Sequence, residues 1–200
     1  PSAAPAPELP QLRRPGRVCV LLLRDAGTVS AVLAERPPTL DEILGPQWRD
    51  LEWRLHNLYW IVDEHGKSIP FEPNEEQLDF VRNIHTRNLI LKARQLGFST
   101  LLEILQLDQA LFNANHTGSV ISDTRENGGK LFGKIEHAYA KLPATLLEAL
   151  PLKAMASKSS IEFEHGSGIW VATSARGGTV QFLHVSELGK ISRRHPQRAQ

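Results

Sequence analysis

The sequence predicts an α/β fold in which helices flank a mainly parallel sheet. Residues 98–112 are apolar on almost every side and contain neither Gly nor Pro, which indicates a buried helix. Residues 125–142 carry apolar residues at helical spacing on one face only. Short apolar runs that predict strands lie at 89–91, 118–122, 160–163, 168–172 and 180–185. Helices and strands alternate first and short strands follow, an order typical of α/β proteins.

The first 39 residues differ in composition from the rest. Five of the first 15 residues are Pro, which predicts a disordered leader. Residues 17–33 predict two short strands around a turn, and Pro37 and Pro38 close this segment. We therefore expect residues 1–39 to be a leader, disordered or foreign to the fold, and residues 40–200 to form one partial domain.

The segment before the central helix predicts a helix, a hairpin and a second helix. Residues 40–55 have helical spacing, and residues 58–62 and 68–71 predict strands joined by a turn. Asn74 and Gln77 stand at the N-cap and N3 positions of a helix that places Leu78, Val81 and Ile84 on its apolar face. Further along, Asp123 or Thr124 caps the amphipathic helix, and Pro143 and Pro151 bracket a short one.

Composition excludes several classes of protein. Cys19 is the only cysteine, so there is no disulfide framework and no cysteine-based zinc site. No apolar run approaches the roughly 18 residues of a membrane span, and the first residues show no pattern typical of a signal peptide, so we expect no membrane association and a cytoplasmic location. The net charge is +1, but five cations face one acid from Arg176 onward. That basic end indicates either a DNA-binding face or a solvated surface.

Residues 88–100 have the order strand, short loop, hydroxyl pair and helix in which a P-loop holds phosphates. Measured against G-x-x-x-x-G-K-[ST], Gly97 takes the second Gly position and Ser99 the hydroxyl position. Lys92 stands where the first Gly is expected, and Phe98 stands where the Lys is expected. The positive charge must then come from Lys92 and Arg94, the two cations within reach.

A second motif follows about 90 residues later. Residues 179–187 form an apolar strand that ends in Glu187, and P-loop ATPases place the Mg²⁺ carboxylate and the catalytic Glu at the end of such a strand. With residues 94–99 and the Gly-rich residues 174–178, the chain resembles the ATPase domain of the large terminase subunit of tailed bacteriophages. The resemblance covers roughly residues 54–200 and rests on three separated motifs in the same order.

The resemblance implies ATP and Mg²⁺ as cofactors and a role for each matching residue. Glu187 would be the catalytic base, Arg94 an arginine finger on the γ-phosphate, and Arg176 a residue that reaches a neighbouring subunit's nucleotide. Ser186 departs from the usual Asp and would hold a metal-bound water, with Ser99 as the other metal-facing hydroxyl. The implied nucleotide-binding residues are Gln77, Lys92, Arg94, Gln95, Gly97, Phe98, Ser99 and Thr100.

Each assignment has a structural alternative. The side-chain amide of Gln77 either hydrogen-bonds the adenine base or only completes the capping box. Arg94 is a surface residue at a strand end, and Glu187 is a helix cap. Arg176 bonds local carbonyls instead of a neighbour's nucleotide, and Asp123, a weak candidate, is better explained as a cap.

The resemblance implies a viral DNA-packaging motor that couples ATP hydrolysis to translocation of double-stranded DNA in the bacterial host. Its expected partners are double-stranded DNA, a small terminase subunit, a portal protein and further copies in a ring. Another P-loop translocase of helicase type and an inactive prophage remnant are the alternatives. The resemblance stops at Gln200, inside the ATPase domain, so we expect the 200-residue chain by itself to show little ATPase and no nuclease activity.

Overall fold

The structure is a computed structural model, and it describes residues 17–23, 29–35, 39–91, 96–156, 159–174 and 179–194. The chain divides into two compact units, Pro1–Arg49 and Asp50–Gln200, which are described separately. The domain limits expected from the sequence stay a prediction.

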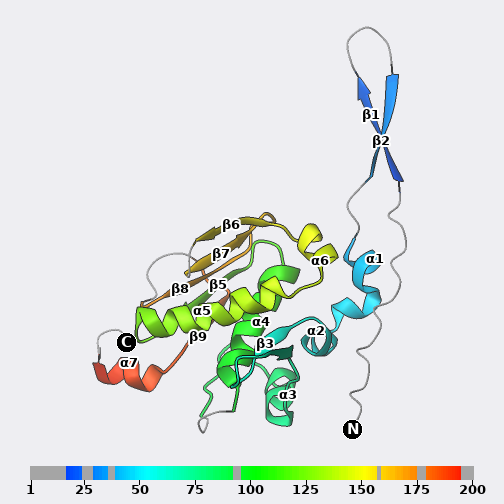
Figure 1. Cartoon of the computed structure of the whole chain (residues 1–200). Coiled ribbons are helices and arrows are strands. Elements are labelled where there is room, and N and C mark those ends of the chain that lie inside the picture. Colours follow the sequence, from blue (N-terminus) through cyan, green and yellow to red (C-terminus); the bar gives the residue numbers. More distant parts are fainter. Residues whose placement is uncertain are drawn as a thin grey trace, which may run out of the picture. The chain divides into compact units, whose positions relative to one another are not determined.

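The first unit contains a hairpin and two short helices (Figure 1). Strand β1 (Arg17–Leu23) pairs antiparallel with β2 (Val29–Glu35), which confirms the two predicted strands. Helix α1 (Leu40–Leu44) is followed by the 3₁₀ helix η1 (Pro46–Arg49). The prediction of one helix over 40–55 is wrong, because Pro46 has no N–H with which to continue α1.

The second unit begins with α2 (Leu51–Asn57), which Asp50 caps by accepting from the N–H of Glu52. Strands β3 (Trp60–Val62) and β4 (Ser68–Pro70) form the predicted hairpin. Helix α3 (Glu75–Arg82) follows, and it ends before Ile84, which is exposed and does not extend the predicted apolar face.

A five-stranded sheet forms the centre of this unit, in the order β6-β7-β8-β5-β9. Its strands are β6 (Leu152–Ala156), β7 (Ser160–Phe163), β8 (Gly168–Ala172), β5 (Thr117–Ile121) and β9 (Phe182–Val185). Neighbours β8, β5 and β9 are parallel, whereas β6-β7 and β7-β8 are antiparallel. The sheet is therefore mixed and not mainly parallel. A short turn joins β7 to β8 and permits only antiparallel pairing, and β6 was not predicted at all.

The predicted strand at 89–91 is wrong. These residues have no regular secondary structure, and Leu89 and Leu91 are 76% and 90% exposed. A strand exists only when a neighbour accepts its backbone hydrogen bonds. Among the described residues, β9 stands at the edge of the sheet and no strand of this segment pairs with it.

Helices α4 (Phe98–Phe112) and α5 (Arg125–Ala140) cover the same face of the sheet (Figure 1). Gln106 of α4 packs on Gly118 of β5, and Gly128 of α5 packs on Val171 of β8. Val171 is paired in register with Val120, two residues after Gly118, so both contacts lie on one side of the sheet. Two shorter helices, α6 (Ala144–Ala149) and α7 (Leu188–Arg194), complete the described elements.

Candidate functional site

The N-terminus of α4 follows a left-handed residue and carries no side-chain cap. Gly97 has φ 68° and ψ 2° and stands at the N-cap position, where it makes no side-chain hydrogen bond. Its carbonyl accepts from the N–H groups of Thr100 and Leu101 at 2.9 and 3.0 Å. A helix start without a side-chain cap leaves N–H donors that point outward, and these donors attract anions.

Gln77 holds the residues before this helix in place. Its side-chain oxygen accepts from the N–H of Asn74 at 3.0 Å, and its own N–H donates to Asn74 Oδ1 at 2.9 Å. The capping box predicted from the sequence is therefore present, and it does not decide between the two roles proposed for Gln77. The amide nitrogen Nε2 of Gln77 donates to the carbonyl of Leu96 at 3.2 Å. A Cβ atom added to Gly97 would lie 2.7 Å from the same Nε2 atom. The adenine contact stays a prediction.

The register between α4 and β9 decides which side chains meet. Glu103 Oε1 lies 2.8 Å from His184 Nδ1, and Gln106 Nε2 donates to the Phe182 carbonyl at 3.3 Å. A later helix residue thus contacts an earlier strand residue, so the two elements run antiparallel.

The same register brings the two motifs found in the sequence together. Ser99 lies four residues before Glu103, about 6 Å along a helix. Ser186 lies two residues after His184, in the turn that directly follows β9. Ser99 at the start of α4 therefore faces the end of β9, where Ser186 and Glu187 follow.

Glu187 adopts an unusual backbone conformation. Its φ is +60°, which non-glycine residues rarely adopt and which costs about 1–2 kcal/mol. Its carboxylate is half exposed and lies 2.5 Å from Lys190 Nζ. Ser186 before it is buried and donates its N–H to the Ile121 carbonyl at 2.8 Å. Strained residues of this kind concentrate at functional sites, so the outlier supports a hypothesis of function.

Four of the residues expected from the sequence lie outside the described part of the chain: Lys92, Arg94, Gln95 and Arg176. The alternatives for these residues stay open. Asp123 accepts a hydrogen bond from Asn127 Nδ2 at 2.7 Å, while the N-cap of α5 is Thr124, which accepts from the N–H of Asn127 at 3.1 Å. The other expected residues lie around the start of α4 and the end of β9.

Sequence reasoning missed the pair formed by Glu103 and His184. Both side chains are buried, and no group among the described residues hydrogen-bonds Glu103 Oε2. Burial raises the pKa of the Glu103 carboxyl above its ordinary value, and the contact with His184 opposes that shift. One signal was present in the sequence, an acidic residue in the middle of a helix that the sequence predicts to be buried.

The hydroxyl groups of Ser99 and Ser186 suit an Mg²⁺ ion only if phosphate oxygens supply further ligands. No group of three or more His, Cys, Asp or Glu side chains suited to a metal occurs in the described part of the chain. Mg²⁺ in nucleotide sites keeps several waters and takes few protein ligands in addition to phosphate oxygens. Hydroxyl groups meet that requirement, so Ser99 at the start of α4 would bind the ion directly and Ser186 after β9 would bind it through water.

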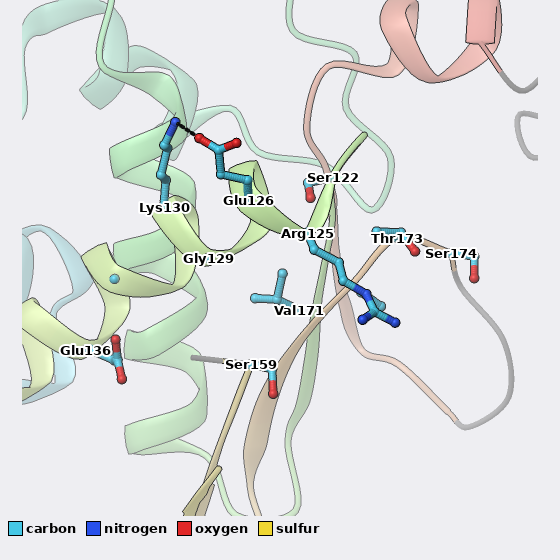
Figure 2. Close-up of a pocket in the computed structure, with 12 residues that line it drawn as sticks. Ser122, Arg125, Glu126, Gly129, Lys130, Glu136, Ser159, Val171, Thr173 and Ser174 are labelled. Carbon is cyan, nitrogen blue, oxygen red and sulfur yellow. Dashed lines mark hydrogen bonds and ion pairs between the residues drawn. The ribbon is translucent and has the colours of Figure 1, made fainter. Parts of the chain in front are cut away.

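A separate hollow of about 900 Å³ lies beside α5, at the ends of β5 and β8 (Figure 2). Figure 2 shows Lys130 joined to Glu126, at 2.7 Å, and Arg125 extending toward the side on which Thr173 lies. The hollow is also lined by Glu136, so two cations are balanced by two carboxylates. Its charge therefore favours no anion, and we assign it no role in the nucleotide site.

The sequence matches no protein-family model and no curated protein. Within the described residues, no helix combines the length and the apolar character that crossing a membrane requires.

Proposed function

We propose that the chain is the P-loop ATPase part of a DNA-packaging motor, of the type found in the large terminase subunit of tailed bacteriophages. The observation that carries the proposal is the antiparallel packing of α4 on β9, which directs the start of α4 toward the end of β9. Gly97 starts α4 without a side-chain cap, and the Glu103–His184 contact aligns Ser99 with the end of β9. Phosphate oxygens would then face the N–H groups at the start of α4.

Glu187 is the proposed general base. It lies one residue beyond Ser186, its side chain reaches solvent, and its backbone is held in a strained conformation. Hydrolysis of a nucleoside triphosphate requires a group that orients the attacking water, and a carboxylate performs this task. Mg²⁺ would arrive with the nucleotide and neutralise the phosphate charge.

The test of nucleotide binding compares Gly97→Ala with Gly66→Ala by titration calorimetry with Mg-ATP. Both glycines have a positive φ, 68° and 78°, so an Ala costs a similar amount of backbone free energy, about 1 kcal/mol, at either position. Only at Gly97 does the new Cβ also collide with Gln77 Nε2.

We expect Gly97→Ala to weaken Mg-ATP binding about tenfold or more and Gly66→Ala to leave it within about twofold, because about 1.4 kcal/mol lost at the loop is a factor of ten. No binding by the unmodified chain at about 1 mM Mg-ATP, the upper end of ordinary KM values, would contradict the proposal. So would an equal loss in both variants.

An inactive nucleotide-binding remnant is the second candidate, favoured by Ser186 in the position where the resemblance implies Asp. Phosphate release with double-stranded DNA, measured for a longer protein that contains this chain, separates the two. Release that stops in Glu187→Gln while Mg-ATP binding persists supports the motor. Binding without release in the unmodified protein supports the remnant.

A further inference from the structure

The hollow of about 900 Å³ beside α5 runs along one side of this helix. Arg125 lines the hollow in the first turn of α5, and Gly129 and Gly133 follow at intervals of about one turn. Glu136 lines it near the other end. A Cβ atom added to either glycine would meet no described atom within 4 Å. This side of α5 is therefore open and leaves room for a further segment to pack on it.

Two opposite charges stand at the ends of this open side. Arg125 and Glu136 are separated by close to three helical turns, so they lie on nearly the same side of α5 and about 16 Å apart along it. Figure 2 shows them at opposite ends of the part of α5 that borders the hollow. Neither forms an ion pair with another described residue, whereas Lys130 and Glu126 pair with each other at 2.7 Å. One cation and one anion therefore remain available to a partner.

The face of the sheet beside α5 also has an uncovered part. Met155 of β6 pairs in register with Ile161 of β7, and Ile161 pairs with Ile169 of β8. Paired residues share a face, so Met155 lies on the face that carries Val171, on which Gly128 of α5 packs. Met155 is 44% exposed, so the described helices leave this edge of the face open. A second helix beside α5 would find apolar surface here.

We propose that a second copy of this chain packs along this hollow, with the two α5 helices antiparallel across a two-fold axis. An axis midway between Arg125 and Glu136 places Arg125 of each copy opposite Glu136 of the other, with the two glycines of each helix between these pairs. A parallel arrangement would instead place like charges opposite each other.

The charges of the surface select its occupant. A two-fold interface brings the same patch of both copies together, so the patch must complement itself. Arg125 and Glu136 meet this requirement, because each of them finds its opposite charge in the second copy. The inference goes beyond the proposed function and does not depend on nucleotide binding.

The experiment measures the mass of the 200-residue chain by sedimentation velocity, without nucleotide, between about 1 and 100 μM. The variants are Arg125→Glu, Glu136→Arg and an equimolar mixture of these two. Arg87→Glu is the matched control, because it makes the same charge reversal in the exposed loop before α4. Gly133→Gln fills the hollow without changing the charge, and Gln has a higher helix propensity than Gly. Circular dichroism checks that each variant is folded.

We expect the unmodified chain to form a dimer and each charge reversal on α5 to weaken the dimer about tenfold or more, because both pairs of opposite charges become pairs of like charges. The mixture should restore the dimer with one copy of each variant, since every Glu then lies opposite an Arg. Gly133→Gln should also weaken the dimer about tenfold or more, and Arg87→Glu should stay within about twofold of the unmodified chain.

Four results would overturn the proposal. An unmodified chain that remains monomeric at about 100 μM would do so, and so would a trimer or larger ring, because a two-fold contact closes at two copies. Dimers unchanged by both reversals would place the interface elsewhere. A mixture that remains monomeric would exclude the antiparallel pairing. None of these results affects the proposed nucleotide site, whose test is the binding of Mg-ATP.

Discussion

Helix α4 carries two buried carboxylates, and the two are satisfied very differently. Asp108, near the end of the helix, accepts from Arg54 Nε at 2.7 Å, from Arg54 Nη2 at 2.8 Å and from the Tyr59 hydroxyl at 2.7 Å. Glu103, near the start, has one oxygen on His184, while the other has no hydrogen-bond partner within the described part of the chain.

The difference separates a structural pair from a pair that lies beside the proposed nucleotide site. Asp108 and its partners join α2 to α4, and the Arg54 guanidinium also lies 4.7 Å from the centre of the Phe112 ring. Burial, followed by the Asp108 charge, raises the pKa of the Tyr59 hydroxyl, so this hydroxyl remains a donor. Every oxygen of this cluster has a partner, which is the condition for a buried charge to be tolerated.

The Glu103 pair does not meet that condition. A buried acceptor without a partner costs about 1–3 kcal/mol. Glu103 lies one turn from Ser99 and beside Lys134, at the point where the proposed nucleotide would bring negative charge. We therefore expect Asp108 to govern stability and Glu103 to govern the response of the protein to pH.

The largest effect is expected for Asp108→Ala. This change leaves the Arg54 guanidinium buried without its carboxylate, and breaking a buried pair in this way costs about 3–5 kcal/mol. Urea unfolding followed by circular dichroism gives the free energy of unfolding. The control is Glu126→Ala, which breaks an exposed pair with Lys130 and should change stability little. Similar values for the two variants would mean that Asp108 is not the anchor of α2 on α4.

A smaller, pH-dependent effect is expected for Glu103→Gln. Because the pKa of Glu103 is raised in the folded protein, the folded state holds its proton more tightly than the unfolded state, whose pKa is near the ordinary value of 4.5. The stability from this group is fully present below pH 4.5 and is lost as pH rises through the folded pKa. The amide side chain of the Glu103→Gln variant has no proton to lose. The free energy of unfolding of this variant should therefore match that of the unmodified chain below pH 4.5 and exceed it as pH rises through the folded pKa of Glu103.

Unfolding free energies measured in urea from about pH 4 to pH 8 test this difference. Glu126→Gln is the control, since Lys130 lowers the pKa of Glu126 and any effect should have the opposite sign. A constant difference between Glu103→Gln and the unmodified chain across the range would show that Glu103 does not titrate as a buried acid.

The smallest effect is expected for a change at Glu187, whose backbone is strained and which lies beside the proposed nucleotide site. Glu187→Gly removes a side chain from a position with φ +60°, so we expect a gain of about 1 kcal/mol in stability together with loss of any hydrolysis. Lys190→Ala measures what the exposed pair with Glu187 contributes, which should be little. A destabilised Glu187→Gly variant would indicate that contacts of the Glu187 side chain outweigh the strain of its backbone.

Local sequence patterns determined several elements of this fold. The apolar run after Gly97 predicted α4, and the spacing of Asn74 and Gln77 predicted the capping box. The predicted hairpin β3–β4 and the strands predicted at 160–163 and 168–172 are also present. These features depend on residues a few positions apart, so turn chemistry and side-chain periodicity suffice to specify them. The sequence likewise predicted that Ser99, Ser186 and Glu187 belong to one site, and that assignment stays a prediction.

Only the tertiary structure decided the rest. The apolar residues 89–91 form no strand, because a strand needs a neighbour whose position the segment does not encode. The Glu103–His184 contact joins residues 81 positions apart, and the Arg54–Asp108 pair joins residues 54 apart. Lys134 likewise reaches Thr100 only because α5 packs on α4. Contacts between distant residues depend on how helices and strands pack, so a single sequence shows the groups that can pair but not the pairs that form.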